Sequence, residues 1–181
     1  DCPALENEIA RCITDRGEVA DAASPALGRI RSELQVAHSR LMSKLQEYGP
    51  HARHVAFLAM TLWDHLRRMH RLPAETRHLL QYAALLHDVG AVLNFDHHAE
   101  HSAYVIRNGN LRGLSAQEVQ MVACIARYHA KGRPGKGDRD YRNLPKSWRR
   151  AVQWLAALLR IAEGLDRSHY QLIRGLRVVR R

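Results

Sequence analysis

Apolar residues recur at helical spacing along most of the chain. After His51, for example, Val55, Leu58, Ala59 and Leu62 fall on one face of a helix. Such stripes predict helices at about 4–12, 25–48, 51–71, 75–88, 97–108, 115–130 and 146–166. A strand pattern occurs only at residues 176–179. We therefore expect an all-α fold.

Local signals place several helix ends. Ser115 and Glu118 are spaced as a capping box that begins the sixth helix. Pro73 and Pro145 stand where proline is favoured, at the start of the fourth and seventh helices. The run Asn108-Gly109-Asn110 predicts the turn between the fifth and sixth helices.

The first part of the chain has a different pattern from the rest. Ser24 and Pro25 begin a long helix whose apolar stripe consists of Leu27, Ile30, Leu34, Leu41 and Leu45. The stripe ends abruptly at Tyr48-Gly49-Pro50. We expect residues 1–48 to form a helical extension or hairpin and residues 49–181 to form one helical domain, since 181 residues suffice for one substantial core.

Charge, cysteine content and hydropathy each add to this picture. The formal net charge of +10 favours polyanionic partners, such as nucleotides, polyphosphate or nucleic acid. The three cysteines, Cys2, Cys12 and Cys124, show no paired spacing, which is typical of a reducing compartment. No apolar run reaches transmembrane length and no signal peptide is visible, so we expect a cytoplasmic protein that does not act in a membrane.

Candidate chemistry is concentrated in the pair His87-Asp88, which ends the apolar run of residues 79–86. His51 and Asp166 stand in two other largely apolar helical segments, where an uncompensated charge would be costly to bury. Together these side chains offer nitrogen and oxygen donors for a divalent metal ion. The alternative is that His87 and Asp88 form a structural pair in the core.

Longer motifs around these residues resemble the HD superfamily of metal-dependent phosphohydrolases. The segments LLQYAALLHDVGAVLNFDHHAEHSAYVIRNGNLRGLSAQE, IARYHAKGRP and LAALLRIAEGLDRSH are similar to the HD-like helical domain of the exopolyphosphatase and guanosine pentaphosphate phosphohydrolase family. The resemblance covers residues 50–181 and implies an all-α HD-domain helical bundle with an N-terminal helical extension.

The resemblance also implies a set of site residues. Its metal ligands would be His51, His87, Asp88, Asp166, His98 and His129, with Asp88 bridging two ions. The cofactor would be one or two divalent ions per chain, of Mn, Fe, Co, Ni, Zn or Mg, and His87 and Asp88 would act in catalysis by activating a water molecule. The pattern departs from that of two-metal relatives at Ala130, where they often carry a second histidine.

Other histidines compete with these candidates. His97 and His101 lie four residues apart and share a helix face, whereas His98 points about 100° away, and spacing alone does not decide which of them is a ligand. The resemblance favours His98. Histidines 38, 65, 70 and 78 stand among polar residues and are expected to be exposed.

A basic segment follows His129 directly. It runs from Lys131 to Arg139 and contains Gly and Pro, which predicts a loop. Arg127, Lys131 and Arg133 are our candidates for phosphate contacts at the mouth of the metal site. The alternative is a solvated basic loop with no binding role.

Residues 1–48 resemble a different protein. The segment ALENEIARCITDRGEVADAASPALGRIRSELQVAHSRLMSKLQEY is similar to a helical core segment of the bacterial MutS paralogue that carries a C-terminal nuclease-like domain. That paralogue's ATPase motifs do not occur in this sequence. The resemblance therefore implies helix packing only, and a fusion, natural or engineered, near Tyr48.

The combined expectation is a metal-dependent phosphohydrolase acting on a phosphorylated, polyanionic substrate such as a nucleotide, an alarmone or polyphosphate. The alternative is a noncatalytic HD-like accessory module that binds metal, polyphosphate or nucleic acid and mediates dimerisation, because in the polyphosphatase family the hydrolytic centre lies in preceding domains. A homodimer is compatible with both readings.

Overall fold

Helices account for all of the regular structure in the described part of the chain. The computed structural model describes residues 20–135 and 137–179. Its elements are α2 (Ala20–His65), α3 (Arg67–His70), α4 (Thr76–Leu86), the 3-10 helix η1 (Val89–Val92), α5 (His98–Asn108), α6 (Ala116–Arg127), α7 (Arg139–Arg142) and α8 (Lys146–Leu165). The all-α prediction is confirmed. The helix expected at 4–12 lies outside the described residues.

The strand pattern at residues 176–179 does not form a strand. That segment is irregular, and none of the described residues forms a strand with which it could pair. Leu176 instead packs against the hydrophobic core, and Val179 is exposed. The apolar residue Leu176 of this short pattern thus packs on the helices of the core and does not belong to a sheet.

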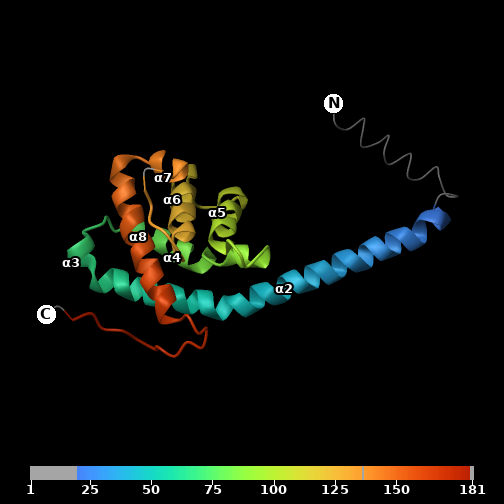
Figure 1. Ribbon diagram of the computed structural model, residues 1–181, viewed down its shortest axis with the longest axis horizontal. Helices are drawn as coiled ribbons and strands as arrows, with labels where there is room; N and C mark the ends of the chain where they lie inside the picture. The colour runs from blue at the N-terminus through green and yellow to red at the C-terminus, as the bar shows by residue number, and fades with distance from the viewer. Residues whose placement is uncertain (1–19, 136, 180–181) are drawn as a thin grey trace. The chain divides into compact units, whose positions relative to one another are not determined.

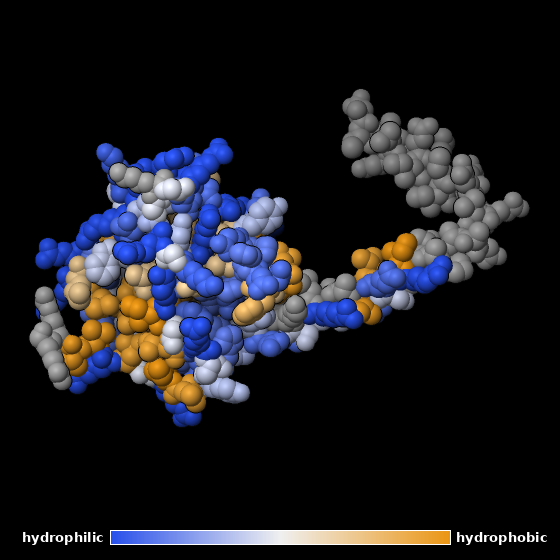
Figure 2. Space-filling view, in the orientation of Figure 1, coloured by the Kyte–Doolittle hydropathy of each residue, from blue (hydrophilic) through white to orange (hydrophobic). Residues whose placement is uncertain are grey.

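The chain divides into two compact units, Asp1–Ser43 and Lys44–Arg181. In the first unit, the described residues belong to α2. Ile30, Leu34 and Val36 are exposed there, and hydrophobic groups stand at the surface of this segment in Figure 2. Of the predicted apolar stripe, Ile30 and Leu34 are therefore exposed, and the side chains of Leu27, Leu41 and Leu45 lie outside the described residues.

The helix break expected at Gly49-Pro50 does not occur, because α2 continues from Ala20 to His65. Proline has a backbone φ close to the helical value and costs the helix one backbone hydrogen bond. The helical signals on both sides outweigh that loss. The chain then turns after α3, where Arg71 adopts a left-handed conformation with φ of 52°.

The second unit is a helical bundle built around α6. Helices α4, α6 and α8 contact one another, and α5 packs on α6 and η1 (Figure 1). Residues 121–126 of α6 are all buried, so the second half of this helix is covered on every side. The predicted stripe of α2, Val55, Leu58, Ala59 and Leu62, is buried in the same core.

Two local predictions can be compared with the backbone. The capping box is confirmed: the Glu118 amide donates to Ser115 Oγ at 3.3 Å, and the Ser115 amide donates to Glu118 Oε2 at 2.8 Å. The short helix α7 was not predicted. Asp138 begins it by accepting hydrogen bonds from the amides of Asp140 and Tyr141.

The expectation of an exposed His70 is wrong. This side chain is completely buried, with Nε2 2.9 Å from the Trp63 carbonyl oxygen and Nδ1 accepting from the Leu72 amide at 3.0 Å. It joins the end of α2 to the turn after α3. His65 is exposed as expected and His78 is half-buried beside Glu118, whereas the side chain of His38 lies outside the described residues.

Gly90 fixes how closely η1 approaches α5. A Cβ atom at this position would overlap the backbone of His98, His101 and Ser102. The Gly90 amide donates to the buried Ser102 Oγ at 2.9 Å. This contact sets the distance between Asp88, which precedes η1, and His98, the first residue of α5.

Among the described helices, none combines the length and the apolar character needed to cross a membrane.

Candidate metal centre

Five elements of the second unit bring imidazoles and carboxylates together. His51 comes from α2, His87 and Asp88 from the end of α4, His98 from the start of α5, His129 from just after α6, and Glu163 from the last turn of α8. His51, His87, Asp88 and His129 are buried, and His98 and Glu163 are half-buried. We call these six residues the cluster.

Each imidazole of the cluster is held by its Nδ1 atom. His87 Nδ1 lies 2.7 Å from the Ala84 carbonyl oxygen and His129 Nδ1 lies 2.6 Å from that of Ala126. His98 Nδ1 lies 2.9 Å from the Phe95 carbonyl oxygen. A carbonyl oxygen can only accept, so these three Nδ1 atoms carry the hydrogen and donate. In the neutral tautomer, Nε2 is then left as a lone-pair donor that faces the cluster.

The resulting geometry needs a positive charge at its centre. His98 Nε2 and His129 Nε2 face each other at 3.2 Å, and His87 Nε2 lies 3.1 Å from Glu163 Oε2. Lone pairs that face each other at these distances repel unless a proton or a metal ion lies between them. Imidazole and carboxylate donors suit Zn²⁺, Mn²⁺, Fe²⁺, Co²⁺ or Ni²⁺, so the cluster fits a divalent ion.

Asp88 links the two halves of the cluster. Its Oδ2 atom lies 3.5 Å from His87 Nε2 and 3.8 Å from His51 Nε2. Its Oδ1 atom lies 3.4 Å from His129 Nε2 and 3.5 Å from His98 Nε2. Two groups that could each hold an ion, His51/His87/Asp88 and Asp88/His98/His129, therefore share this carboxylate.

Glu163 is a cluster residue that the sequence interpretation missed. Its Oε2 atom lies 2.9 Å from His51 Nε2 and 3.1 Å from His87 Nε2. The available signal was its place in the apolar stretch of α8, three residues before Asp166 and so on the same side of the helix.

Asp166, which was predicted as a metal ligand, contacts His51 from outside the cluster. Its Oδ2 atom accepts from His51 Nδ1 at 2.9 Å, on the edge of the ring opposite Nε2. Its Oδ1 atom accepts from the Gln171 amide at 2.8 Å. Both oxygens are thus engaged outside the cluster, in the position behind His51 where carboxylates commonly stand behind metal-binding histidines.

Burial and charge oppose each other in the cluster. Burial raises the pKa of Glu163, but its hydrogen bonds with His51 and His87 outweigh this and hold the pKa far below its usual value. Burial also raises the pKa of Asp88, yet His129 and His87 bring it below the ordinary value. For His51, burial lowers the pKa, and the bonds to Glu163 and Asp166 more than compensate and raise it. The carboxylates are therefore ionised at neutral pH and ready to bind a cation.

The structure separates the three neighbouring histidines. His98 Nε2 reaches His129 and Asp88, whereas His97, at the N-cap of α5 with φ of 59°, is exposed. His101 is not part of any potential metal-binding group among the described residues.

The candidate phosphate contacts fall into two kinds. Arg127 pairs with Asp138 at 3.4 Å. Lys131 and Arg133 are exposed, and no described residue forms an ion pair with either. Lys136, in the same basic loop, lies outside the described residues.

Arg160 of α8 donates to the carbonyl oxygens of Tyr128, His129 and Gly132, and so fixes the start of this loop beside the cluster.

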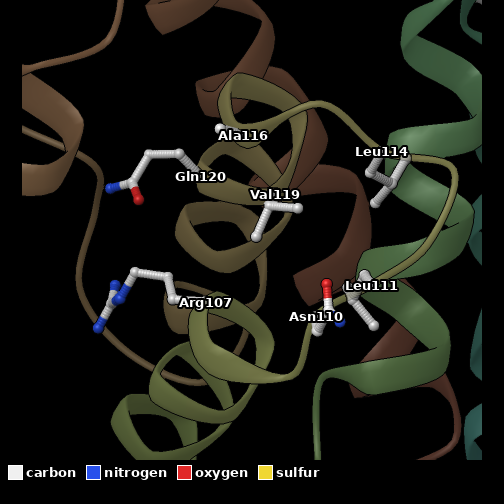
Figure 3. Close-up of a pocket in the computed structure, with 7 residues that line it drawn as sticks. All are labelled: Arg107, Asn110, Leu111, Leu114, Ala116, Val119 and Gln120. Carbon is white, nitrogen blue, oxygen red and sulfur yellow. The ribbon is translucent and has the colours of Figure 1, made fainter. Parts of the chain in front are cut away.

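A separate pocket of about 430 Å³ lies where α5 leads into α6. Figure 3 shows Arg107 and Gln120 on one side of it and Leu111 and Leu114 on the other. The Arg107 guanidinium is already paired with Asp140 at 2.6 Å. None of the residues that line this pocket belongs to the cluster.

Comparison with known proteins gives two overlapping similarities. Residues 35–177 match the family described as Ppx/GppA phosphatase, domain III. The chain is also 32% identical over 126 residues to Endonuclease MutS2 of Bacillus velezensis, covering 68% of this chain and 16% of that protein. Endonuclease MutS2 of Thermomicrobium roseum is 50% identical over 46 residues, 25% of this chain and 6% of that protein.

A third relative matches this chain over the same number of residues as the first. Putative endonuclease MutS2 of Bacillus subtilis is 29% identical over 126 residues, again 68% of this chain and 16% of that protein. The chain thus spans about 16% of the length of both Bacillus relatives. Because 126 residues exceed the first 48, the likeness to MutS2 is not confined to the N-terminal part, contrary to our expectation.

Proposed function

We propose that this chain, which belongs to the Ppx/GppA phosphatase domain III family, is a metal-dependent phosphohydrolase module of the HD type that acts on phosphorylated, polyanionic substrates. One observation carries the proposal. The Nε2 atoms of four histidines, each from a different helical segment, all face one shared carboxylate, that of Asp88. A domain that served packing alone would not need such a cluster, because burying these groups without a partner is costly.

The proposed ligands form two sets. His51, His87, Asp88 and Glu163 would hold one ion, and Asp88, His98 and His129 would hold a second. When bound, a divalent ion neutralises phosphoryl oxygens and lowers the pKa of a coordinated water. Asp166 keeps His51 in the required orientation through its Nδ1 atom.

The chain's own residues would complete the reaction site. Asp88, with its pKa held low, is ionised at neutral pH and can accept a hydrogen bond from the attacking water. Lys131 and Arg133 lie on the loop that follows His129, where their free cations would attract phosphate groups. The formal net charge of +10 favours the same class of substrate.

A noncatalytic polyanion-binding module is the second candidate. It is favoured by the relatives named Endonuclease MutS2, and by cations of the basic loop that no described carboxylate neutralises. In this case Lys131 and Arg133 would contact phosphates of nucleic acid or polyphosphate, and the cluster would hold a structural ion. Dimerisation of the module is compatible with this role.

The experiment is metal analysis combined with a phosphatase screen. The purified chain is exchanged against excess Mn²⁺, desalted and analysed for metal per chain, next to His87→Ala/Asp88→Ala and the control His97→Ala. We expect one or two equivalents in the wild type and the control, and none in the double variant. Phosphate release from nucleotides and polyphosphate should depend on the same residues.

Two results would decide against parts of this proposal. Absence of metal from the wild-type protein would overturn the metal site and the enzyme together. Metal binding without phosphate release, with weaker polyanion binding in Lys131→Ala/Arg133→Ala, would favour the noncatalytic module. Glu163→Gln should lower metal affinity more than Asp166→Asn does. For Asp166→Asn we expect a loss of metal affinity of about 10- to 100-fold, which is typical of a residue that holds a ligand in place.

A further inference from the structure

The turn after α8 places one more imidazole beside the cluster. His169 donates its amide to the Asp166 carbonyl oxygen at 2.8 Å, and the Gln171 amide donates to Asp166 Oδ1 at 2.8 Å. His169 and Gln171 both have positive φ, 60° and 50°. Non-glycine residues are uncommon in this conformation, and such outliers gather at functional sites. Asp166 therefore orients His51 and shapes the turn that carries His169.

The ring of His169 lies directly on that of His51. The two ring centroids are 3.7 Å apart and the ring planes differ by 1°. His51 is almost completely buried, whereas His169 is exposed. Tyr48 also contacts His169, in an edge-to-face arrangement with ring centroids 6.4 Å apart. His169 thus covers the solvent-facing side of the His51 half of the cluster.

The donor atoms of His169 are also within reach of the same half. One ligand atom each from His51, Glu163 and His169 lie within 4.8 Å of one another. Two nitrogen atoms bound to one ion are at most about 4.2 Å apart, because each metal–nitrogen bond is about 2.1 Å. The His169 donor atom is therefore close enough for a rotation of the side chain to bring it to an ion held by His51 and Glu163.

The stacked position is not the ligating one. Imidazole lone pairs lie in the plane of the ring, so two parallel rings cannot both point at one ion. His169 is exposed, and rotation about its side-chain bonds is not blocked by a buried partner. It can leave the stack while its backbone stays held by Asp166.

We propose that His169 is an exchangeable ligand that swings from its stack on His51 to an ion held by His51, His87 and Glu163. This inference rests on the proposed metal site and deepens it. The ion would then have three nitrogen donors, a set that favours Zn²⁺, Co²⁺, Ni²⁺ or Mn²⁺ over Mg²⁺. The same side chain covers the position before metal binding and closes the coordination shell afterwards.

The test is a Co²⁺ titration of the full chain, followed by visible absorption and by calorimetry. We compare the wild type with His169→Ala, His169→Phe and the control His97→Ala, another exposed histidine with positive φ. Both His169 variants should keep the number of ions but bind one of them at least tenfold more weakly, with an altered Co²⁺ absorption band. His97→Ala should match the wild type.

The Phe variant separates ligation from stacking, because phenylalanine can stack on His51 and offers no nitrogen. Wild-type affinity and spectrum in His169→Phe would overturn the inference and leave a stacking role. Wild-type behaviour of His169→Ala would overturn it as well. If the wild type itself binds no Co²⁺, Mn²⁺ or Zn²⁺, the proposed metal site fails and this inference fails with it. Circular dichroism of each variant establishes that the helical fold is retained.

Discussion

Single side chains in this protein often serve two neighbours at once. Asp166 binds His51 Nδ1 with one oxygen and the Gln171 amide with the other. Asp88 faces two histidines with each of its oxygens. Because one residue meets several needs, a substitution at these positions should disturb orientation and charge together.

Cys124 gives a prediction at the residue scale. It is completely buried in α6, and burial, the largest cause, raises the pKa of its thiol to about 12. The thiolate fraction at pH 8 is then about 10⁻⁴, and the thiolate is the reactive form. In a Cys2→Ser/Cys12→Ser background, we expect almost no reaction of the native protein with a disulfide reagent at pH 8.

The measurement is the rate of thiol labelling with and without guanidinium chloride. Labelling should become fast only when the protein unfolds. Fast labelling of the native protein would show that Cys124 is accessible, contrary to its burial.

The sequence sufficed for part of the site at this scale. His51, His87, Asp88, His98 and His129 could be named from motif and context, and all five lie in the cluster. The sequence interpretation named Asp166 and missed Glu163, since residues three apart share a helix face and only their side-chain geometry separates them. His70 was misjudged because polar neighbours in sequence do not reveal that its ring fills the core beside Trp63.

At the scale of elements, the cluster depends on how closely helices approach. Helices α4 to α6 were predicted to within a few residues, because their apolar stripes and the capping box at Ser115 are strong local signals. The continuity of α2 through Pro50 was not predicted, since a proline alone does not show whether the helix-forming residues on both sides outweigh its cost.

Gly90 gives the prediction at this scale. In Gly90→Ala, the new methyl group would overlap the backbone of α5, so η1 and α5 must move apart. We expect a loss of about 3 kcal/mol in the free energy of unfolding, at the upper end for overpacking, and weaker metal binding by the His98 half of the cluster. Denaturant unfolding and metal titration measure the two effects.

Gly164 provides the matched control. It lies within α8, and a Cβ atom there would meet no atom within 4 Å. Gly164→Ala should be neutral or stabilising by up to about 1 kcal/mol, because alanine favours a helix. Equal stability of the two alanine variants would contradict the close approach at Gly90.

At the scale of the whole molecule, we propose that residues 1–48 and 49–181 are separate functional parts. The division of the chain into Asp1–Ser43 and Lys44–Arg181 supports this, with a boundary a few residues earlier. All six cluster residues belong to the second unit. The apolar pattern changes near this division, although that change is not a break in the helix.

A fragment comprising residues 44–181 should therefore fold by itself. We expect a single cooperative thermal transition and the same number of bound Mn²⁺ ions as in the full chain, measured by circular dichroism and metal analysis. A fragment comprising residues 60–181 should fail, because it lacks His51 and the core residues Val55 and Leu58. Failure of the longer fragment to fold would show that the first unit is needed for the second.

The bond between His51 and Asp166 has a consequence for the order of events during folding. These residues are 115 positions apart, so the bond closes a very long loop and forms only after the first and last helices of the bundle have met. Ions therefore have no assembled binding position in the early stages of chain collapse. Ion capture should follow folding rather than start it, and added metal should slow unfolding while leaving the refolding rate nearly constant.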